Sequence, residues 1–140
     1  MSSNMYFSPS ENVSSIAVFI DGDNILPSFS PKILEILKKE GNCDVVNLYA
    51  DFSLASNSEW KHFSQSTMNC VQVWTPTARC KNSTDFKMTI DIVKCSFEYP
   101  QIDTIAIVSG DGDFIPVGNE MRRLGKRLFC LLYTSPSPRD

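Results

Sequence analysis

Histidine is nearly missing from this 140-residue chain, in which His62 is the one example. The five cysteines are odd in number and none forms a Cys-x-x-Cys pair, so the patterns of a zinc site and of a disulfide framework are both lacking. We therefore expect reduced thiols and a cytoplasmic location. Cys43, Cys70 and Cys130 fall in or beside expected strands, where a free cysteine packs as a small apolar residue.

Long hydrophobic runs and an excess of positive charge are also lacking. No apolar stretch approaches the ~20 residues of a membrane helix, and the start of the chain does not have the pattern of a secretory signal. The net charge of −3 argues against a protein that coats nucleic acid nonspecifically. It leaves open an enzyme that acts on nucleic acid, because bound metal cations would offset the acidic charge locally.

The composition otherwise suits one globular domain, with 42% hydrophobic and 21% charged residues. Residues 1–15 are rich in Ser, Asn and Pro and predict a disordered leader. Residues 133–140 contain two prolines and no periodicity, and we expect an unstructured tail, either a native linker or a foreign end. The folded domain is therefore expected over residues 16–132.

Strands and helices are expected to alternate along this domain. Runs of apolar residues predict strands, and apolar residues at helical spacing between them predict amphipathic helices. The expected strands are 16–21, 45–50, 70–74, 104–108 and 127–132, with helices at about 30–40, 57–67, 83–97 and 113–124. This order indicates an α/β fold, a three-layer α/β/α sandwich around a parallel sheet of about five strands.

Two of these helices have a marked apolar stripe. In the helix over 83–97 the stripe consists of Phe86, Ile90, Val93 and Phe97, and we expect it to face the core. In the last helix the expected buried stripe consists of Phe114, Val117, Met121 and Leu124.

The strongest functional signal is a turn that occurs twice. The strand Ile16–Ile20 ends in Asp21-Gly22-Asp23-Asn24, and the strand at 104–108 is followed by Asp111-Gly112-Asp113. Ligands of open parallel sheets bind at the carboxyl ends of the strands. If the two strands are neighbours, their four aspartates converge, and clustered carboxylates require cations or shared protons.

The helix over 83–97 supplies a third acidic source. Asp85 lies in its first turn and can reach the same edge of the sheet, whereas Asp91 lies deeper and suits a supporting or a structural role equally well. Asn24 can hold a phosphate, a water or a carboxylate, or simply form an Asx turn. Oxygen ligands without His or Cys favour Mg²⁺ or Mn²⁺, which activate water for attack on a phosphodiester.

Basic residues near the site would bind the rest of a nucleic-acid strand. The candidates are Arg79, Lys81 and Lys87 on one side and Arg122, Arg123 and Lys126 on the last helix. Trp74 could stack on a base, although a Trp at the end of a strand more often belongs to the core.

These motifs, taken in order, resemble the NYN domain, and more narrowly the LabA-like branch of the PIN-like nucleases. The resemblance is carried by four segments: Val18–Asn24, Lys81-x3-Asp85-x5-Asp91, Val108-Ser109-Gly110-Asp111-Gly112-Asp113-Phe114-x-Pro116, and Leu124-Gly125-Lys126. It implies a sheet with strand order 3-2-1-4-5 and a metal-dependent ribonuclease acting on single-stranded RNA. It also implies an acidic metal-binding quartet of Asp21, Asp85, Asp111 and Asp113, accompanied by Asn24, with Asp23, Asp91 and Ser109 in support.

Two other hypotheses remain open at this stage. A module that binds RNA or regulates a partner could retain the acidic pocket without activity, and the chain could have protein partners or form a homodimer. A phosphatase of the haloacid-dehalogenase type would use Asp21 as nucleophile and Asp23 as general acid, but it leaves Asp85 without a role.

Overall fold

A computed structural model of the chain describes residues 13–64, 68–74, 83–110 and 114–132. The expected leader and tail fall almost entirely outside these residues, and so do Arg79, Lys81, Asp111 and Asp113. Within the described part, no helix has both the length and the apolar character needed to cross a bilayer.

Strands and helices alternate along the described chain as the sequence predicts, and their ends differ from the expected ones by a few residues. The strands are β1 (Ser14–Asp21), β2 (Gly41–Ala50), β3 (Asn69–Gln72), β4 (Thr104–Ser109) and β5 (Arg127–Leu132). The α-helices are α1 (Ser30–Lys38), α2 (Trp60–Phe63), α3 (Ser83–Glu98) and α4 (Ile115–Arg123). Two 3-10 turns, η2 (Pro27–Phe29) and η3 (Ala55–Asn57), precede α1 and α2.

The five strands form one parallel sheet in the order β3-β2-β1-β4-β5. β1 therefore lies at the centre, and its register with β4 pairs Ile20 with Val108. The predicted fold class and strand order are thus confirmed. Because β1 and β4 are parallel neighbours, the two segments that follow them leave the same edge of the sheet.

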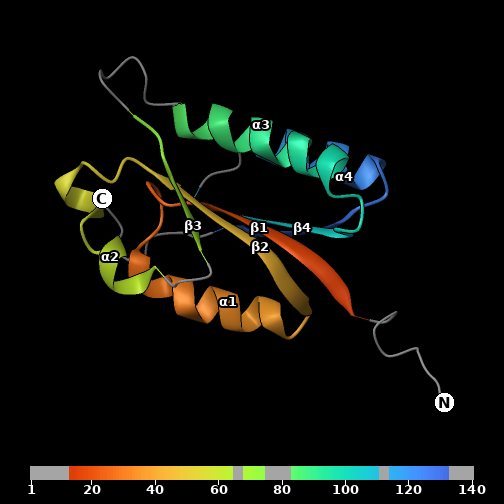
Figure 1. Ribbon diagram of the computed structural model, residues 1–140, viewed down its shortest axis with the longest axis horizontal. Coiled ribbons are helices and arrows are strands. Elements are labelled where there is room, and N and C mark those ends of the chain that lie inside the picture. Colours follow the sequence, from red (N-terminus) through yellow and green to blue (C-terminus); the bar gives the residue numbers. More distant parts are fainter. Residues whose placement is uncertain (1–12, 65–67, 75–82, 111–113, 133–140) are drawn as a thin grey trace.

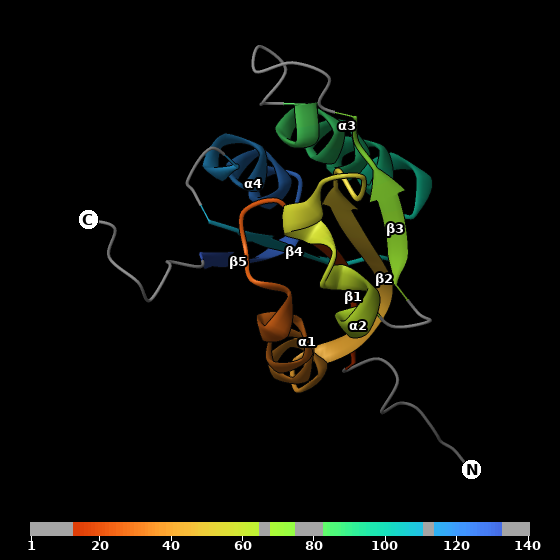
Figure 2. The ribbon, with the colours of Figure 1, turned by 90° about the vertical axis from the view of Figure 1, so that its left-hand side faces the viewer.

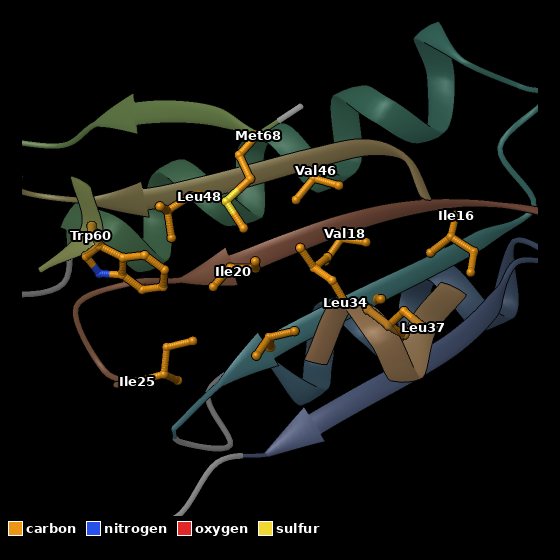
Figure 3. Close-up of a cluster of buried hydrophobic side chains, with 12 residues drawn as sticks. Ile16, Val18, Ile20, Ile25, Leu34, Leu37, Val46, Leu48, Trp60 and Met68 are labelled. Carbon is orange, nitrogen blue, oxygen red and sulfur yellow. The ribbon is translucent and has the colours of Figure 1, made fainter. Parts of the chain in front are cut away.

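Helices cover both faces of the sheet, with α3 and α4 on one side and α1 and α2 on the other (Figures 1 and 2). Alternate residues of β1 serve the two interfaces: Ile16, Val18 and Ile20 face α1, whereas Ala17 and Phe19 face α3. Figure 3 shows the apolar cluster on the α1 side of the sheet. In this cluster Trp60 of α2 lies near the carboxyl ends of the strands. All five apolar residues of β1 are buried, as the sequence predicts for a central strand.

The prediction of which face of α3 is buried is wrong. The buried residues of α3 are Thr84, Met88, Ile92 and Cys95, and of the expected stripe only Val93 packs against the core. The other three residues of that stripe point away from the sheet, where Phe86 is 67% exposed, Ile90 55% and Phe97 76%. Both stripes have helical spacing, so periodicity did not distinguish them, and the packing of Met88, Ile92 and Cys95 against the sheet decided the outcome.

Smaller corrections concern single residues. Leu124, expected in the buried stripe of α4, is exposed just after the helix ends, although Phe114 and Met121 are buried. Cys70 and Cys130 lie in the outer strands β3 and β5 and are exposed rather than packed. Trp74 projects into solvent beyond β3 instead of joining the core.

Candidate active site

The site begins where β1 ends. Asp21 is the last residue of that strand and is completely buried. Directly after it, the Gly22 amide donates to the Tyr49 carbonyl of β2 at 2.7 Å. A Cβ atom on Gly22 would lie 2.9 Å from this carbonyl oxygen and 2.9 Å from Leu48 Cδ1, so only glycine fits the turn without displacing β2.

Two side chains hold the Asp21 carboxylate. Asn24 Nδ2 donates to Asp21 Oδ2 at 2.8 Å, and Ser109 Oγ donates to the same oxygen at 3.1 Å. The Asn24 amide also donates to the Asp21 carbonyl at 3.2 Å, which closes the turn. Ser109 is the last residue of β4 and is fully buried, so the two neighbouring strands meet at this carboxylate. A buried charge needs such partners, since desolvation otherwise costs several kcal/mol.

Asp23 has a different task, which is to connect loops. Its Oδ1 accepts hydrogen bonds from Asn57 Nδ2 at 2.8 Å and from the Asp51 amide at 3.2 Å. Its Oδ2 accepts a hydrogen bond from Thr84 Oγ1 at 2.8 Å. Asp23 therefore joins the turn after β1 to the segment after β2 and to the first turn of α3.

Sequence reasoning did not assign a role to Asp51, a second buried carboxylate at the edge. Asp51 follows β2, and its Oδ1 accepts hydrogen bonds from Gln72 Nε2 at 2.8 Å and from the Ser53 amide at 3.1 Å. Asn57, also buried, spans from Asp23 Oδ1 to the Asp51 carbonyl. The sequence did contain one indication of Asp51, because it follows an apolar strand as Asp21 does. It contains no such indication for the polar partners Gln72 and Asn57.

Asp85 is half-buried in the first turn of α3. Because α3 follows β3, this turn lies at the same edge of the sheet as Asp21, and the Thr84–Asp23 hydrogen bond fixes it there. The structure thus brings Asp21, Asn24, Ser109, Asp23 and the turn bearing Asp85 to one edge. Asp111 and Asp113 lie two and four positions after Ser109 in the chain, outside the described residues.

Asp91 lies further along α3 and joins a separate network under the helix. Tyr49 Oη donates to Asp91 Oδ2 at 2.8 Å, and Lys87 Nζ lies 3.2 Å from Asp91 Oδ1. Asn47 Nδ2 donates to the Tyr49 hydroxyl at 3.0 Å. Burial, followed by the hydrogen bond to Asp91, raises the pKa of Tyr49 well above its ordinary value. This arrangement ties α3 to β2 and gives Asp91 a structural contact rather than one to Asp21.

The basic residues of the last helix do not join the cluster. α4 begins near the carboxyl edge of the sheet and leads back to the start of β5, where Arg127 pairs with Thr104 at the start of β4. Arg122, Arg123 and Lys126 therefore lie at the opposite edge from Asp21. There Lys126 bonds to the Ile102 carbonyl, and Arg123 forms an ion pair with Glu120. Among the described basic candidates, only Lys87 lies within the first two turns of a helix that starts at the acidic edge.

The donor chemistry of this edge suits a hard divalent cation. Asp21 and Asp85 offer carboxylate oxygens, Asn24 and Ser109 offer neutral ones, and oxygen donors of this kind bind Mg²⁺ and Mn²⁺. Within the described ranges, no three His, Cys, Asp or Glu side chains converge into a complete metal site. The predicted ligands Asp111 and Asp113 come after Gly110 in the sequence and lie outside these ranges.

The family model of the NYN domain matches residues 15–140. The chain belongs to the NYN domain family. This membership places it among the PIN-like nucleases, whose members generally use divalent metal ions and act on RNA. The suspected family is thereby confirmed, whereas the LabA-like branch remains a prediction.

A solved structure supports the fold of this NYN domain. The protein of unknown function from Vibrio parahaemolyticus RIMD 2210633 superimposes with a TM-score of 0.64 at 17% sequence identity. The alignment covers 88% of this chain and 83% of that one. At this level of identity the likeness concerns the fold alone. The search of curated proteins finds no match.

Proposed function

We propose that this NYN domain is a Mg²⁺- or Mn²⁺-dependent ribonuclease that hydrolyses phosphodiester bonds at the edge formed by β1, β4 and α3. The observation that carries the proposal is Asp21, a carboxylate with 0% exposure at the end of the central strand, held by Asn24 and Ser109. Burying a carboxylate lowers the stability of the fold because the charge loses its hydration. Buried ionisable groups of this kind are concentrated at functional sites.

The residues of the chain would orient the reaction. Asn24 and Ser109 hold one carboxylate oxygen of Asp21 from two directions, which fixes the plane of the carboxylate. Asp85 would complete the metal-binding set from α3, and Asp111 and Asp113 from the segment after β4. When bound, the metal would supply Lewis acidity that lowers the pKa of water and neutralises charge on the phosphoryl group. Asp23 would contribute indirectly, because it holds the first turn of α3, and with it Asp85, in place.

Single-stranded RNA is the proposed substrate because the surface around the site favours stacking over charge. Trp74, two strands away from Asp21 on the same edge, is 66% exposed and presents its ring to solvent. A cavity of about 360 Å³ next to Asn57, lined by Phe52, Lys61 and Cys70 among others, has the size of a small-molecule pocket. Stacked, unpaired bases suit such surfaces, whereas a duplex requires many phosphate contacts.

The environment of Asp23 disfavours the phosphatase alternative. A general acid must carry a proton and direct it at the leaving group. Asp23 instead accepts hydrogen bonds on both oxygens from Asn57, Thr84 and the Asp51 amide. Both oxygens of Asp23 therefore connect segments of the protein to one another.

The test is cleavage of an end-labelled single-stranded RNA by purified protein with Mn²⁺, with Mg²⁺ and with EDTA. We expect cleavage that depends on the metal and falls at least about 100-fold in Asp21→Asn and in Asp111→Asn. Asp103→Asn is the matched control, because Asp103 is exposed at the opposite edge of the sheet. Circular dichroism of each variant separates loss of chemistry from loss of fold.

Two outcomes would contradict the proposal. Full cleavage by both variants would show that the assigned acids do not form the centre. RNA binding without cleavage under any metal would instead favour an inactive RNA-binding module.

A further inference from the structure

A cavity of about 360 Å³ lies between β3 and α2, next to the acidic edge. Cys70 of β3 is in register with Leu48, which belongs to the apolar cluster on the α1 side of the sheet, so Cys70 faces the same side as α2. Trp60, Lys61 and Ser64 line the cavity from α2 and from the residue that follows this helix. The proposed metal chemistry uses none of these side chains.

Two residues in the wall of this cavity also hold the turn after the central strand. Asn57 Nδ2 donates to Asp23 Oδ1 at 2.8 Å, and Trp60 Nε1 donates to the Gly22 carbonyl at 3.1 Å. Gly22 and Asp23 directly follow Asp21 in the chain. The cavity therefore adjoins the proposed active site through its own wall, and a group bound in it would lie beside the acidic edge.

The lining of the cavity is almost neutral. Among the lining residues that the structure describes, Lys61 is the one charged side chain. Phe52 and Trp60 contribute aromatic rings, and Ser58 and Ser64 contribute hydroxyl groups, which both donate and accept hydrogen bonds. Apolar walls with a few polar groups suit a flat, uncharged heterocycle better than a bare phosphate. Proteins recognise the unstacked bases of single-stranded RNA in this way, with aromatic side chains and hydrogen bonds to the base edges.

The volume of the cavity suits one base rather than a stack of bases. Pockets for small ligands span about 300–1,000 Å³, and 360 Å³ lies near the lower end of that range. We propose that this cavity binds one unpaired nucleobase of the RNA, on a nucleotide next to the phosphodiester at the acidic edge, and favours some bases over others. Lys61, which is exposed, would contact the phosphate of that nucleotide. The identity of the ligand rests on the proposed ribonuclease function, but binding in the cavity can be measured without cleavage.

The thiol of Cys70 gives a direct measure of binding in the cavity. Cys70 is a free, exposed cysteine, and so is Cys130 in β5, the outer strand at the other side of the sheet. Cys130 lies outside the lining of the cavity and serves as the internal control. Burial raises the pKa of both thiols, so their alkylation by iodoacetamide should be followed at about pH 8.5.

The probes are the nucleoside monophosphates of A, C, G and U, and ribose 5-phosphate is the control that lacks a base. At about 10 mM, a nucleotide with a Kd of about 1 mM occupies most of the sites. We expect at least one nucleotide to slow the alkylation of Cys70 at least about 5-fold and to leave Cys130 unaffected, as measured by mass spectrometry of the peptides. Protection by none of the nucleotides, equal protection by ribose 5-phosphate, or equal slowing at Cys130 would overturn the proposal.

Filling the cavity tests its role in the choice of RNA. Cys70→Phe would place an aromatic ring in the cavity, and Cys130→Phe, on the opposite outer strand, is the matched control. With homopolymers of A, C and U as substrates, we expect the wild type to prefer one of them by at least about 5-fold in kcat/KM. Cys70→Phe should reduce this ratio to less than about 2-fold, whereas Cys130→Phe should keep it. Circular dichroism shows whether both variants fold.

The outcomes separate this proposal from the ribonuclease proposal. Equal rates of the wild type on the three homopolymers, or an unchanged preference in a folded Cys70→Phe variant, would overturn base binding in the cavity and leave the ribonuclease assignment intact. Absence of cleavage would instead contradict the ribonuclease assignment. In that case, and also if Cys70→Phe does not fold, the protection of the Cys70 thiol in the wild type still decides whether the cavity binds a base.

Discussion

Asp23 Oδ2 accepts a hydrogen bond from Thr84 Oγ1 at 2.8 Å across 61 positions of sequence. The bond joins the turn after the central strand to the first turn of α3, and Thr84 itself is buried against the core. Asp85 follows Thr84 directly, so its position depends on this contact. The residue that positions Asp85, one of the four proposed acidic ligands, is therefore a neutral threonine.

Replacing this threonine should impair both stability and cleavage. Thr84→Val keeps the shape but leaves a carboxylate oxygen of Asp23 without one of its donors, which should lower the free energy of unfolding by about 1–3 kcal/mol. Urea denaturation measures this loss, and the RNA assay should show reduced cleavage at saturating metal. Thr89→Val, half-buried further along the same helix, should change stability by less than about 0.5 kcal/mol. Equal effects of both substitutions would argue against a special role for Thr84.

Metal binding should raise the thermal stability of the domain. A ligand present at 100 times its Kd stabilises the folded state by about 2.7 kcal/mol, which corresponds to roughly 9 °C in Tm. Differential scanning calorimetry with Mg²⁺ or Mn²⁺ should show this shift in the wild type and not in Asp21→Asn. Without metal, Asp21→Asn should be at least as stable as the wild type because repulsion among the acids is relieved. An undiminished metal shift in this variant would place the ion elsewhere.

Gly22 should tolerate alanine poorly, in contrast to Gly118. At Gly22 the added Cβ would lie 2.9 Å from the backbone oxygen of Tyr49 and 3.2 Å from Ala50 Cβ, which cannot move without disturbing β2. We expect Gly22→Ala to lower the free energy of unfolding by about 2 kcal/mol or more. At Gly118 the close atom is Leu128 Cδ2 at 2.9 Å, the end of a flexible side chain. Helix propensity offsets that contact, so Gly118→Ala should stay within about 1 kcal/mol of the wild type.

Tyr49 should make stability fall at alkaline pH. Its folded pKa is raised above the ordinary value of 10.0 by burial and by the Asp91 carboxylate. The stabilisation is therefore fully present below pH 10 and is lost above it, as the unfolded chain releases the phenol proton and the folded chain does not. Tyr49→Phe should remove this contribution and cost about 1–2 kcal/mol at neutral pH through the lost hydrogen bonds. Denaturation curves of both proteins between pH 8 and about 11 provide the comparison.

The elements of the fold were predictable because strand and helix patterns are local. Apolar runs at 16–20 and 104–108 marked the two central strands, and the aspartates that follow them predicted a functional edge. The neighbouring position of β1 and β4 followed from the resemblance to the NYN domain, and the hydrogen bond from Ser109 to Asp21 is consistent with it. Of the proposed acidic set, the described structure locates Asp21 and Asp85, and Asp111 and Asp113 stay predictions.

The polar partners at the edge were not predictable. Asn57 lies in a 3-10 turn, and Gln72 ends a short outer strand, and neither belongs to a pattern of recognisable spacing. Each becomes important only because folding brings it to a distant carboxylate: Asn57 lies 34 positions from Asp23, and Gln72 lies 21 positions from Asp51. The placement of Arg122, Arg123 and Lys126 failed for a related reason: a helix that starts at the acidic edge carries its last turn away from it.

Local pattern thus accounts for the identity of the strands, the acidic turn after β1 and the presence of two apolar stripes on α3. Which stripe would be buried depended on how the whole helix meets the sheet. Met88, Ile92 and Cys95 fit against β1, β2 and β4, and this packing leaves the phenylalanines outside. Periodicity shows that a helix face is apolar. Which of two apolar faces is buried depends on how well the side chains of each fit the surface of the sheet, and that surface is assembled from distant segments of the chain.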